Sequence, residues 1–357
     1  MNKRINWYRI PIDKDKLKLL SQRSDRKGYY QSITHIGLWT ITGLLSFYFF
    51  KKEFWEGFII TLSLHGLVGS HFSHAHHELC HGTVFKTKYL NTLFLNIFSL
   101  LGFLNYHIYK MSHTYHHRNT CFSEGDREVV LPRKPDLGIF YLIQLFTINI
   151  FGKNGMLRAL NNFIKISLNN FDNPFNSWSE ELYIDNLEQR VKAKIWARTV
   201  LLFHLFVIIF SFSIGEPIIS VLISFHVFIG GWHHYFLNET QHTGLQSNIA
   251  DFRKCTRSIR INPISEFLYW HMNWHIEHHM YTSVPCYNLK KLHHVISYDM
   301  PEPRSLWDAW VEMRKTWKKQ KTEPNYEFDT PVPKNIIIKN KNIFTYKDLP
   351  SDDLAPI

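Results

Sequence analysis

The sequence predicts an all-α integral membrane protein, on the basis of three patterns. Apolar residues gather in two pairs of blocks with few charges, although the mean hydropathy of the whole chain is only −0.21. Basic residues are scarce in the short segments that join the blocks of each pair. Histidine, with 22 copies in 357 residues, recurs in tight clusters outside these blocks. We therefore expect four transmembrane helices in two hairpins, with a cytosolic helical cap that carries a histidine-rich di-metal centre.

The apolar blocks set the order of the predicted elements. The first pair comprises residues 33–50 and 57–72, and the second comprises 199–214 and 218–232. Each block approaches the roughly 20 residues that a helix needs to cross a bilayer. Two more apolar stretches, 89–104 and 137–151, are predicted to be interfacial or re-entrant helices, because one crossing at 89–104 would separate the first two histidine clusters. The expected segments are a cytosolic N-terminus (1–30), hairpin one (31–75), a cap segment (76–195), hairpin two (196–234), a second cap segment (235–320) and an extended or disordered tail (321–357).

Charge predicts the orientation in the membrane. Of the 41 lysines and arginines, only Lys51 and Lys52 fall in the predicted hairpin tips. Because basic residues are enriched on cytoplasmic loops, the opposite face is predicted to be cytosolic, in a bacterial inner membrane or the endoplasmic reticulum. The net charge of +11 is expected to face anionic lipid, and no nucleic-acid motif accompanies it. The polar N-terminus predicts no cleavable signal peptide, and four isolated cysteines predict no disulfide framework.

Three histidine motifs, called boxes 1 to 3, carry the predicted chemistry. They are His77-Glu-Leu-Cys-His81, His113-Thr-Tyr-His116-His117 and His275-Ile-Glu-His278-His279. Residues three or four apart share one face of a helix, so each box is expected to direct its imidazoles at a single point. Imidazole suits iron, zinc and copper, and eight imidazoles are too many for one ion, so two metals are predicted. Glu78 and Glu277 are expected to orient a ligand imidazole through its far nitrogen, or to pair with a basic residue.

In these boxes the sequence resembles the membrane-bound fatty acid desaturase and hydroxylase superfamily, whose motifs read HxxxH, HxxHH and HxxHH. The resemblance covers residues 30–300 and includes Asn238-Glu-Thr-Gln-His242, which is similar to the isolated histidine motif that precedes the third box. It implies a non-haem di-iron enzyme that uses O2 on the C–H bonds of a lipid or acyl substrate. Asn238 would act as a water-mediated or outer partner. The resemblance implies nine metal ligands: His77, His81, His113, His116, His117, His242, His275, His278 and His279.

The expected reaction is oxygen-dependent desaturation of a fatty acyl chain, held as an acyl lipid or acyl thioester. A separate donor of the ferredoxin or cytochrome b5 type would supply electrons, since the chain has no His-Pro-Gly-Gly haem motif. A hydroxylase on the same scaffold is the main alternative. Box 1 also reads as the His-Glu-x-x-His of zinc proteases, and a metal transporter is the remaining alternative.

The other histidines are assigned secondary roles. If His242 is not a ligand, His234 and then His271 are the next candidates. For three histidines within the predicted spans we expect hydrogen bonds to a neighbouring helix: His35, His204 and His226.

Overall fold

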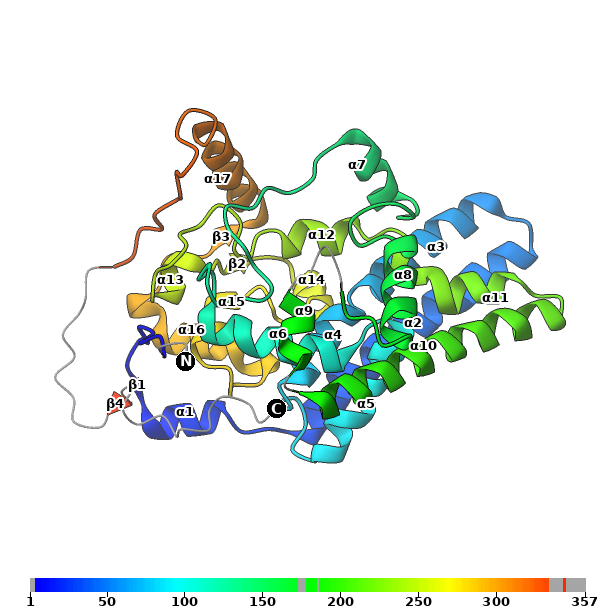
Figure 1. The fold of residues 1–357 in the computed structure, drawn as a ribbon, viewed down its shortest axis with the longest axis horizontal. Helices are drawn as coiled ribbons and strands as arrows, with labels where there is room; N and C mark the ends of the chain where they lie inside the picture. The colour runs from blue at the N-terminus through cyan, green and yellow to red at the C-terminus, as the bar shows by residue number, and fades with distance from the viewer. Residues whose placement is uncertain (1–3, 173–177, 185, 334–342, 345–357) are drawn as a thin grey trace.

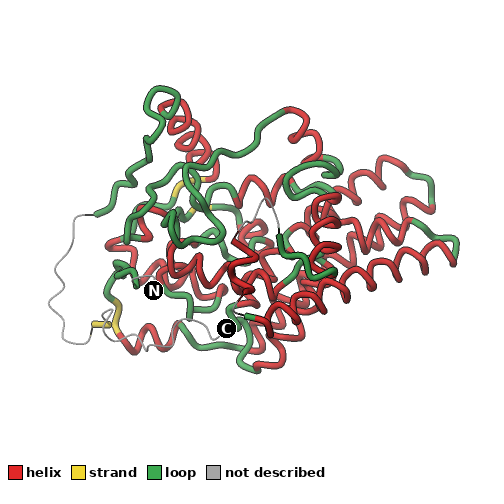
Figure 2. The backbone as a smooth tube through the Cα atoms, viewed as in Figure 1, coloured by secondary structure: helices red, strands yellow, loops and turns green. Residues whose placement is uncertain are grey.

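The computed structural model describes residues 4–172, 178–184, 186–333 and 343–344, and it is built mainly of helices (Figures 1 and 2). The predicted all-helical class is therefore confirmed for these residues. Strands occur only as two short pairs within them: antiparallel β1 (Ile12–Asp13) with β4 (Ile343–Phe344), and parallel β2 (Ile259–Arg260) with β3 (Arg304–Ser305). Both pairs join segments that are far apart in the sequence, so they fasten loops and form no layer of their own.

Two helical hairpins extend to the right in Figure 1. Hairpin one consists of α2 (Asp25–Lys51) and α3 (Trp55–Ser70). Hairpin two consists of α10 (Leu187–Ser213) and an irregular arm of α11 (Ile218–Ser220), the π-turn η1 (Val221–Phe225) and the 3-10 turn η2 (His226–Phe228). α2 and α10 are long and apolar enough to cross a membrane, since 27 residues extend roughly 40 Å against a hydrocarbon core of about 30 Å. Their partners, α3 and the irregular arm, are shorter than a full span.

Local signals explain where these helices begin and end. The Ser24 hydroxyl accepts from the backbone N–H of Lys27 and caps α2. The helix therefore starts at Asp25, eight residues before the apolar block that predicted it. Gly215 adopts a φ of +73° just after α10, a conformation that glycine reaches without strain and that lets the chain reverse.

The outward faces of both hairpins are apolar. Exposed residues include Ile41, Leu44 and Tyr48 on α2, Ile59 and Ile60 on α3, and Leu202, Phe206, Ile209 and Phe212 on α10. The buried faces carry small or polar residues such as Gly43, Ser46, Gly66, Gly69 and Ser211. Small residues let helices approach closely, and an apolar surface of this extent suits contact with lipid. The hairpins thus have the surface of a membrane protein.

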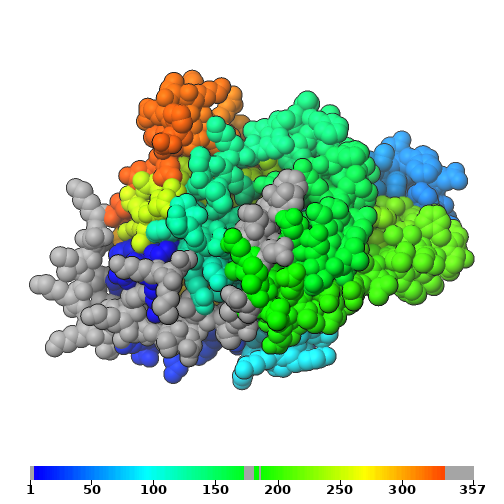
Figure 3. All heavy atoms as spheres, viewed as in Figure 1, coloured from blue at the N-terminus to red at the C-terminus, as the bar shows by residue number. Residues whose placement is uncertain are grey.

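The tips of the two hairpins meet. Lys51 Nζ, at the end of α2, lies 2.6 Å from Glu216 Oε1 in the turn after α10. In Figure 3 both tips project together at the right of the molecule. Both hairpins therefore reverse at the same level, and the rest of the chain, called the cap, lies at their other end.

Of the three hairpin histidines expected to hydrogen-bond a neighbouring helix, His35 and His204 do so, whereas His226 bonds only within its own arm. His35 Nε2 lies 3.0 Å from the Val68 carbonyl oxygen, and its Nδ1 accepts from the Trp270 indole N–H. His204 Nε2 lies 2.9 Å from the Leu100 carbonyl oxygen. The other buried histidines of the hairpins also contact backbone carbonyls: His65 contacts Trp39 and Leu222, and His226 contacts Ile223. These contacts, with the Ser224 hydroxyl at His204 Nδ1, give His35, His65 and His204 a partner at both ring nitrogens. His226 Nε2, by contrast, has no hydrogen-bond partner among the described residues.

The two further apolar stretches do not form straight spans. α5 (Lys88–Leu101) and α6 (Tyr106–Asn119) meet at 108°, which by length and composition makes them either a broken third span or a re-entrant loop. His81, before α5, lies 3.0 Å from His113 on α6 between their Nε2 atoms. The chain therefore returns to its starting level after α5, which favours the re-entrant arrangement. The stretch 137–151 contains only the eight-residue α7 (Ile139–Phe146), too short to cross a bilayer.

The remaining elements surround the boxes. They are α1 (Lys14–Leu20), α4 (Phe72–Cys80), α8 (Met156–Ser167), α9 (Trp178–Ile184), α12 (Trp232–Asn238), α13 (Phe252–Cys255), α14 (Pro263–Leu268), α15 (His275–Met280), η3 (Cys286–Asn288), α16 (Leu289–Ile296), η4 (Ser297–Asp299) and α17 (Leu306–Lys319). The largest apolar core joins N-terminal residues such as Trp7 to α4, α5, α15 and α16. Of the tail predicted to be extended, 334–342 and 345–357 lie outside the described residues, and 321–333 contains no helix.

Candidate metal centre

The eight box histidines and His242 gather at one place in the cap. Their ligand atoms form two groups that could each hold a metal ion, and the atoms within a group lie within 4.8 Å of one another. Group one contains His77, His81, His113, His117 and His278, and group two contains His116, His242, His275 and His279. The histidines come from α4, α6, α15 and the turn after α12, so four segments of the sequence meet here.

Boxes 2 and 3 each divide their ligands between the two groups. Box 2 gives His113 and His117 to group one and His116 to group two, whereas box 3 gives His275 and His279 to group two and His278 to group one. Each residue turns a helix by about 100°, so positions i and i+4 point in similar directions and position i+3 is rotated away from i+4. The expectation that every box converges on one point is therefore wrong for boxes 2 and 3. The division places the groups side by side, with the rings of His117 and His279 4.4 Å apart.

Hydrogen bonds fix the protonated nitrogen of two imidazoles in group two. His242 Nδ1 lies 2.9 Å from the Cys255 carbonyl oxygen, which can only accept. His116 Nδ1 lies 2.9 Å from the Asp126 carboxylate. Each Nδ1 therefore carries a proton and donates it, so in the neutral imidazole each Nε2 has the lone pair that a metal needs.

The other two imidazoles complete group two. Thr120 Oγ1 donates to the His116 carbonyl oxygen and lies 3.1 Å from His279 Nδ1, so it accepts from that nitrogen. His275 Nε2 lies 3.1 Å from His242 Nε2 and 3.2 Å from His279 Nε2. Three buried Nε2 lone pairs and a fourth imidazole thus face one another. A metal cation fits this donor set, because it replaces the repulsion between lone pairs by ligation.

Group one is supported by two carboxylates, the buried Glu78 and the half-buried Glu128. Glu128 Oε2 lies 3.1 Å from His113 Nδ1, and the Ser112 hydroxyl donates to the same carboxylate. Glu78 Oε1 lies 3.1 Å from His77 Nδ1 and 3.3 Å from His278 Nδ1. His77 Nε2 is buried without a hydrogen-bond partner among the described residues. An unpaired buried nitrogen is costly, and its position within group one makes metal ligation the natural compensation.

Burial favours the neutral imidazole that a metal needs, except at His116, where the interactions with Asp126 outweigh burial and raise the pKa. It lowers the pKa of His242 to about 3, so this imidazole is neutral at pH 7, as a ligand must be. It raises the pKa of Glu78 and of Glu128 to about 7. Burial also raises the pKa of Asp126, but the interaction with His116 and two backbone N–H groups outweigh it and hold the pKa below its ordinary value. Asp126 therefore stays ionised beside the imidazole that it orients.

Two residues expected to support the ligands make other contacts. Glu277 accepts from the Ser258 hydroxyl at 2.6 Å and pairs with His293, and it bonds to no box imidazole of the described chain. The expected role of Glu277 is therefore corrected to one of holding α16 against α15. Asn238 is the last residue of α12, and its side chain makes no hydrogen bond to any described imidazole. Because α12 ends there, His242 lies in the turn that follows the helix.

The predicted substitute ligands lie outside both groups. His71, His74 and His233 form a separate chain, with His71 Nδ1 3.0 Å from His74 Nδ1 and His71 Nε2 2.8 Å from His233 Nδ1. The ring of His234 lies 4.7 Å from that of His74, so it belongs to this second cluster. His271 pairs instead with a carboxylate on α14.

Sequence reasoning missed the groups that hold box 2. Asp126 and Glu128 lie in the loop after α6, and the acidic run that begins at Glu124 was the available signal. Carboxylates are frequent partners of the outer nitrogen of a ligand histidine. The carbonyl of Cys255 and the hydroxyl of Thr120 could not be found in this way, because any residue offers a carbonyl and threonine is common.

The geometry argues against the zinc protease interpretation of box 1. In such enzymes the glutamate acts as a general base toward water on the metal. Here the Glu78 carboxylate lies against the Nδ1 atoms of His77 and His278, on the far side of the imidazoles from the ligand atoms of group one. His278, a residue of box 3, also belongs to the same group, which a zinc site built on box 1 alone does not explain.

Two adjacent clusters of buried or half-buried histidines, on a helical frame with two or three candidate spans, define a membrane protein of the metal-binding class. A family model described as fatty acid desaturase matches residues 53–310, more than half of the chain, and this range includes all three boxes and His242. The chain therefore belongs to the fatty acid desaturase family and is an oxidoreductase. No curated protein matches it significantly.

Proposed function

We propose that the protein is an O2-dependent fatty acyl desaturase whose two histidine groups bind a pair of iron ions. The geometry of groups one and two carries this proposal, because α6 and α15 each give ligands to both groups and so hold two ions next to each other. An all-imidazole set suits iron among the metals that such ligands bind. The family match supports the same class of reaction.

An iron pair, when bound, supplies the oxidising power for removing two hydrogen atoms from adjacent methylene groups, with O2 as the acceptor. The balanced reaction converts one CH2–CH2 unit, O2, two electrons and two protons into one CH=CH unit and two water molecules. The electrons come from a separate donor of the ferredoxin or cytochrome b5 type. The chain itself supplies buried or half-buried imidazole ligands, keeps bulk water out, and uses Glu78, Asp126 and Glu128 to orient imidazoles and hold their Nδ1 protons.

The proposed setting is a membrane crossed by both hairpins, with the metal centre on the cytosolic face. Three observations support it: the hairpin tips meet at Lys51 and Glu216, the outer helix faces are apolar, and basic residues lie mostly at the end away from the tips. Such a placement would bring an acyl substrate from the bilayer and electrons from the cytosol to the same centre.

The first prediction tests the metal ligands. Purified protein should contain about two irons per chain. An ordinary zinc site, by comparison, holds one ion with about four ligands. His278→Ala in group one and His242→Ala in group two should each lower the iron content and abolish alkene formation, because each removes a buried ligand. His294→Ala, an exposed histidine of α16, is the matched control and should leave both unchanged. Metal analysis and mass spectrometry of the fatty acids formed with and without oxygen measure these outcomes.

Three results would contradict the proposal. One zinc per chain together with peptide hydrolysis would identify a protease. Full iron content and activity in His242→Ala would remove His242 from the ligand set. An alcohol as the only product would identify a hydroxylase on the same scaffold.

A further inference from the structure

A second cluster of histidines lies beside the metal centre and has no part in the function proposed above. It consists of His71, in the turn between α3 and α4, His74 on α4, and His233 and His234 on α12. His71 and His74 are buried, and His233 and His234 are half-buried. Because buried polar groups in proteins are nearly always hydrogen-bonded, the partners of these imidazoles show what the cluster can do.

Three of these imidazoles form an unbroken row of hydrogen bonds. His71 Nδ1 lies 3.0 Å from His74 Nδ1, and His71 Nε2 lies 2.8 Å from His233 Nδ1. At the end of the row, His233 Nε2 lies 2.9 Å from the Ser265 hydroxyl. We call these four residues the relay. The one ring nitrogen of the relay without a hydrogen-bond partner among the described residues is His74 Nε2, which is buried.

The relay can hold its protons in two neutral arrangements. In the first, Ser265 donates to His233 Nε2, and His233 Nδ1 donates to His71 Nε2. His71 Nδ1 then donates to His74 Nδ1, so His74 Nε2 carries a proton. In the second arrangement all these hydrogen bonds are reversed, and His74 Nε2 has a lone pair. The two arrangements differ by one proton bound at His233 Nε2 and one released from His74 Nε2. Since each ring releases a proton as it accepts another, no buried ring needs to hold a net charge.

The outer end of the relay reaches a polar part of the surface. His233 is half-buried. The Ser265 hydroxyl accepts at 3.0 Å from Nδ2 of Asn262, the exposed residue that caps α14. Arg260, two residues earlier, is exposed as well. Protons from solvent can therefore enter at this end.

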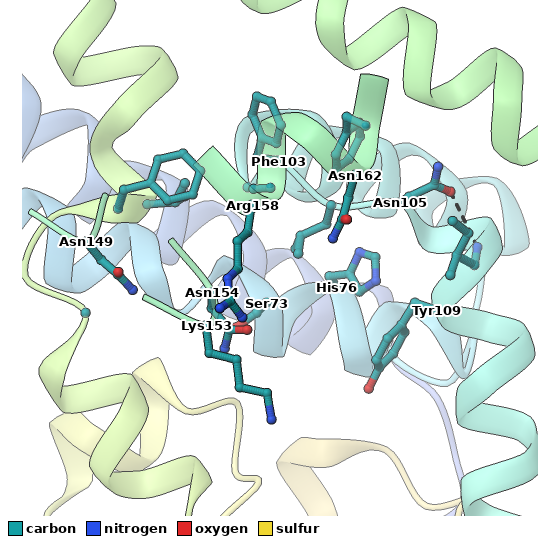
Figure 4. Close-up of a pocket in the computed structure, with 18 of the residues that line it drawn as sticks. Ser73, His76, Phe103, Asn105, Tyr109, Asn149, Lys153, Asn154, Arg158 and Asn162 are labelled. Atoms are coloured by element: carbon teal, nitrogen blue, oxygen red, sulfur yellow. Dashed lines mark hydrogen bonds between the residues drawn. The ribbon is translucent and has the colours of Figure 1, made fainter. Parts of the chain in front are cut away.

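The inner end of the relay lies beside group one. His74 precedes the ligand His77 by three residues on α4, and residues at this spacing have Cβ atoms roughly 5–6 Å apart. His77 Nε2, like His74 Nε2, is buried without a partner among the described residues. Ser73 and His76, on another side of α4, instead line a cavity of about 600 Å³ (Figure 4). A proton released from His74 Nε2 is therefore about one helical turn from group one.

The described titratable side chains next to the relay do not interrupt it. His35 has a partner at both of its ring nitrogens. The Tyr269 hydroxyl accepts from the Gln241 side chain at 2.9 Å, while the Tyr269 ring packs edge-on against His74. His234 contacts the ring of His74 and lines the same cavity as Ser73. The row from Ser265 to His74 thus offers a single continuous path.

We propose that the relay conducts protons from the surface at Ser265 to the interior beside group one. Its proton-transfer residues are His233, His71 and His74, and each accepts a proton at one ring nitrogen and releases one from the other. No electrons move in this step. The purpose of the relay rests on the desaturase function proposed above, because that reaction consumes two protons for each O2 molecule.

The first test does not depend on turnover. The full chain, with isotope-labelled histidine, is loaded with diamagnetic zinc, and exchange of ring N–H protons with deuterated water is followed by NMR. The signal of His74 is assigned by its loss in His74→Gln. His71→Gln keeps a donor and an acceptor, but an amide does not pass a proton on, so exchange at His74 should slow by about tenfold or more. A role in packing alone predicts faster exchange, because a loosened structure opens more often.

His204→Gln is the matched control for this measurement. His204 is also a buried imidazole with a partner at each nitrogen, but it lies in hairpin two and outside the relay. Exchange at His74 should not change in this variant. Unchanged or faster exchange in His71→Gln, or equal slowing in His204→Gln, would overturn the proposal. A third metal ion per chain that His71→Gln removes would identify the cluster as a metal site and would overturn it as well.

Turnover of the iron-loaded protein gives a second measurement. His71→Gln should hold as much iron as the unaltered protein but form alkene about tenfold more slowly, with a larger solvent deuterium isotope effect, because proton delivery then limits the rate. An unchanged rate and isotope effect would contradict the relay. Slower exchange at His74 in His71→Gln, in a protein that forms no alkene, would support the relay and reject the desaturase function.

Discussion

At the scale of single residues, the outer nitrogen of each imidazole decides whether the inner nitrogen can bind a metal. Asp126 illustrates this most fully. Its carboxylate accepts from His116 Nδ1 and also from the backbone N–H groups of Cys121, Glu128 and Val129. The loop after α6 therefore holds the carboxylate in place, and the carboxylate in turn fixes the orientation and tautomer of His116.

A second prediction follows for Asp126. Asp126→Asn should lower metal affinity and turnover by roughly 10- to 100-fold, because an amide accepts less strongly from Nδ1 and can present a donor to it instead. The matched control is Glu124→Gln, an exposed acid in the same loop, which should behave as the unaltered protein. Iron retained after dialysis against graded chelator concentrations is the measurement. Equal retention in both variants would show that Asp126 does not support the centre.

At the scale of elements, glycines in α3 allow hairpin one to pack against hairpin two. A Cβ atom at Gly66 would lie 2.1 Å from the Ile229 carbonyl oxygen, and one at Gly69 would lie 2.0 Å from His226 Cδ2. Both distances are far below van der Waals contact, and the first involves backbone that cannot rotate away. α3 therefore carries glycine where it crosses the η2 segment, despite the low helix propensity of glycine.

This close approach gives a third prediction. Gly66→Ala should destabilise the fold by about 1–3 kcal/mol, as overpacking of a close contact does. Gly37→Ala on α2 is the matched control, since nothing lies within 4 Å of its added Cβ, and alanine there should be neutral or stabilise by up to about 1 kcal/mol. Thermal unfolding in detergent, followed by circular dichroism, compares the two variants. A midpoint in Gly66→Ala as high as in Gly37→Ala would contradict the packing argument.

At the scale of the whole molecule, the contact between the hairpin tips and the convergence of the boxes at the other end set the expected topology. Tags inserted at Lys52 and at Glu216 should react only with reagents on the outer side of the membrane, and a tag beside Arg118 only with reagents on the inner side. Labelling of intact and permeabilised cells or vesicles with an impermeant reagent is the measurement. Labelling of one tip from the outer side and of the other from the inner side would show that the two hairpin tips do not lie on the same side of the membrane. A tag at Arg118 that reacts from outside would contradict the proposal that the metal centre lies on the inner side of the membrane.

The sequence by itself determined the helical class, the places of the long apolar helices and the identity of the histidines that gather. These features depend on local order: an apolar block, a capping serine, or histidines three or four residues apart are visible within a few turns of chain. The boxes also carried the family resemblance, which the match over residues 53–310 confirms.

Only the tertiary structure decided how the ligands are shared and oriented. The box 2 residue His116 meets His242 and box 3 in group two, and Thr120 meets His279 across 159 positions of sequence. Contacts of this kind depend on how helices cross and how loops return, and residue spacing does not encode either one locally. For the same reason Glu277, which is adjacent to a ligand in sequence, pairs with His293 and with no ligand. Asp126, ten positions from His116 in the sequence, is the residue that bonds to that imidazole.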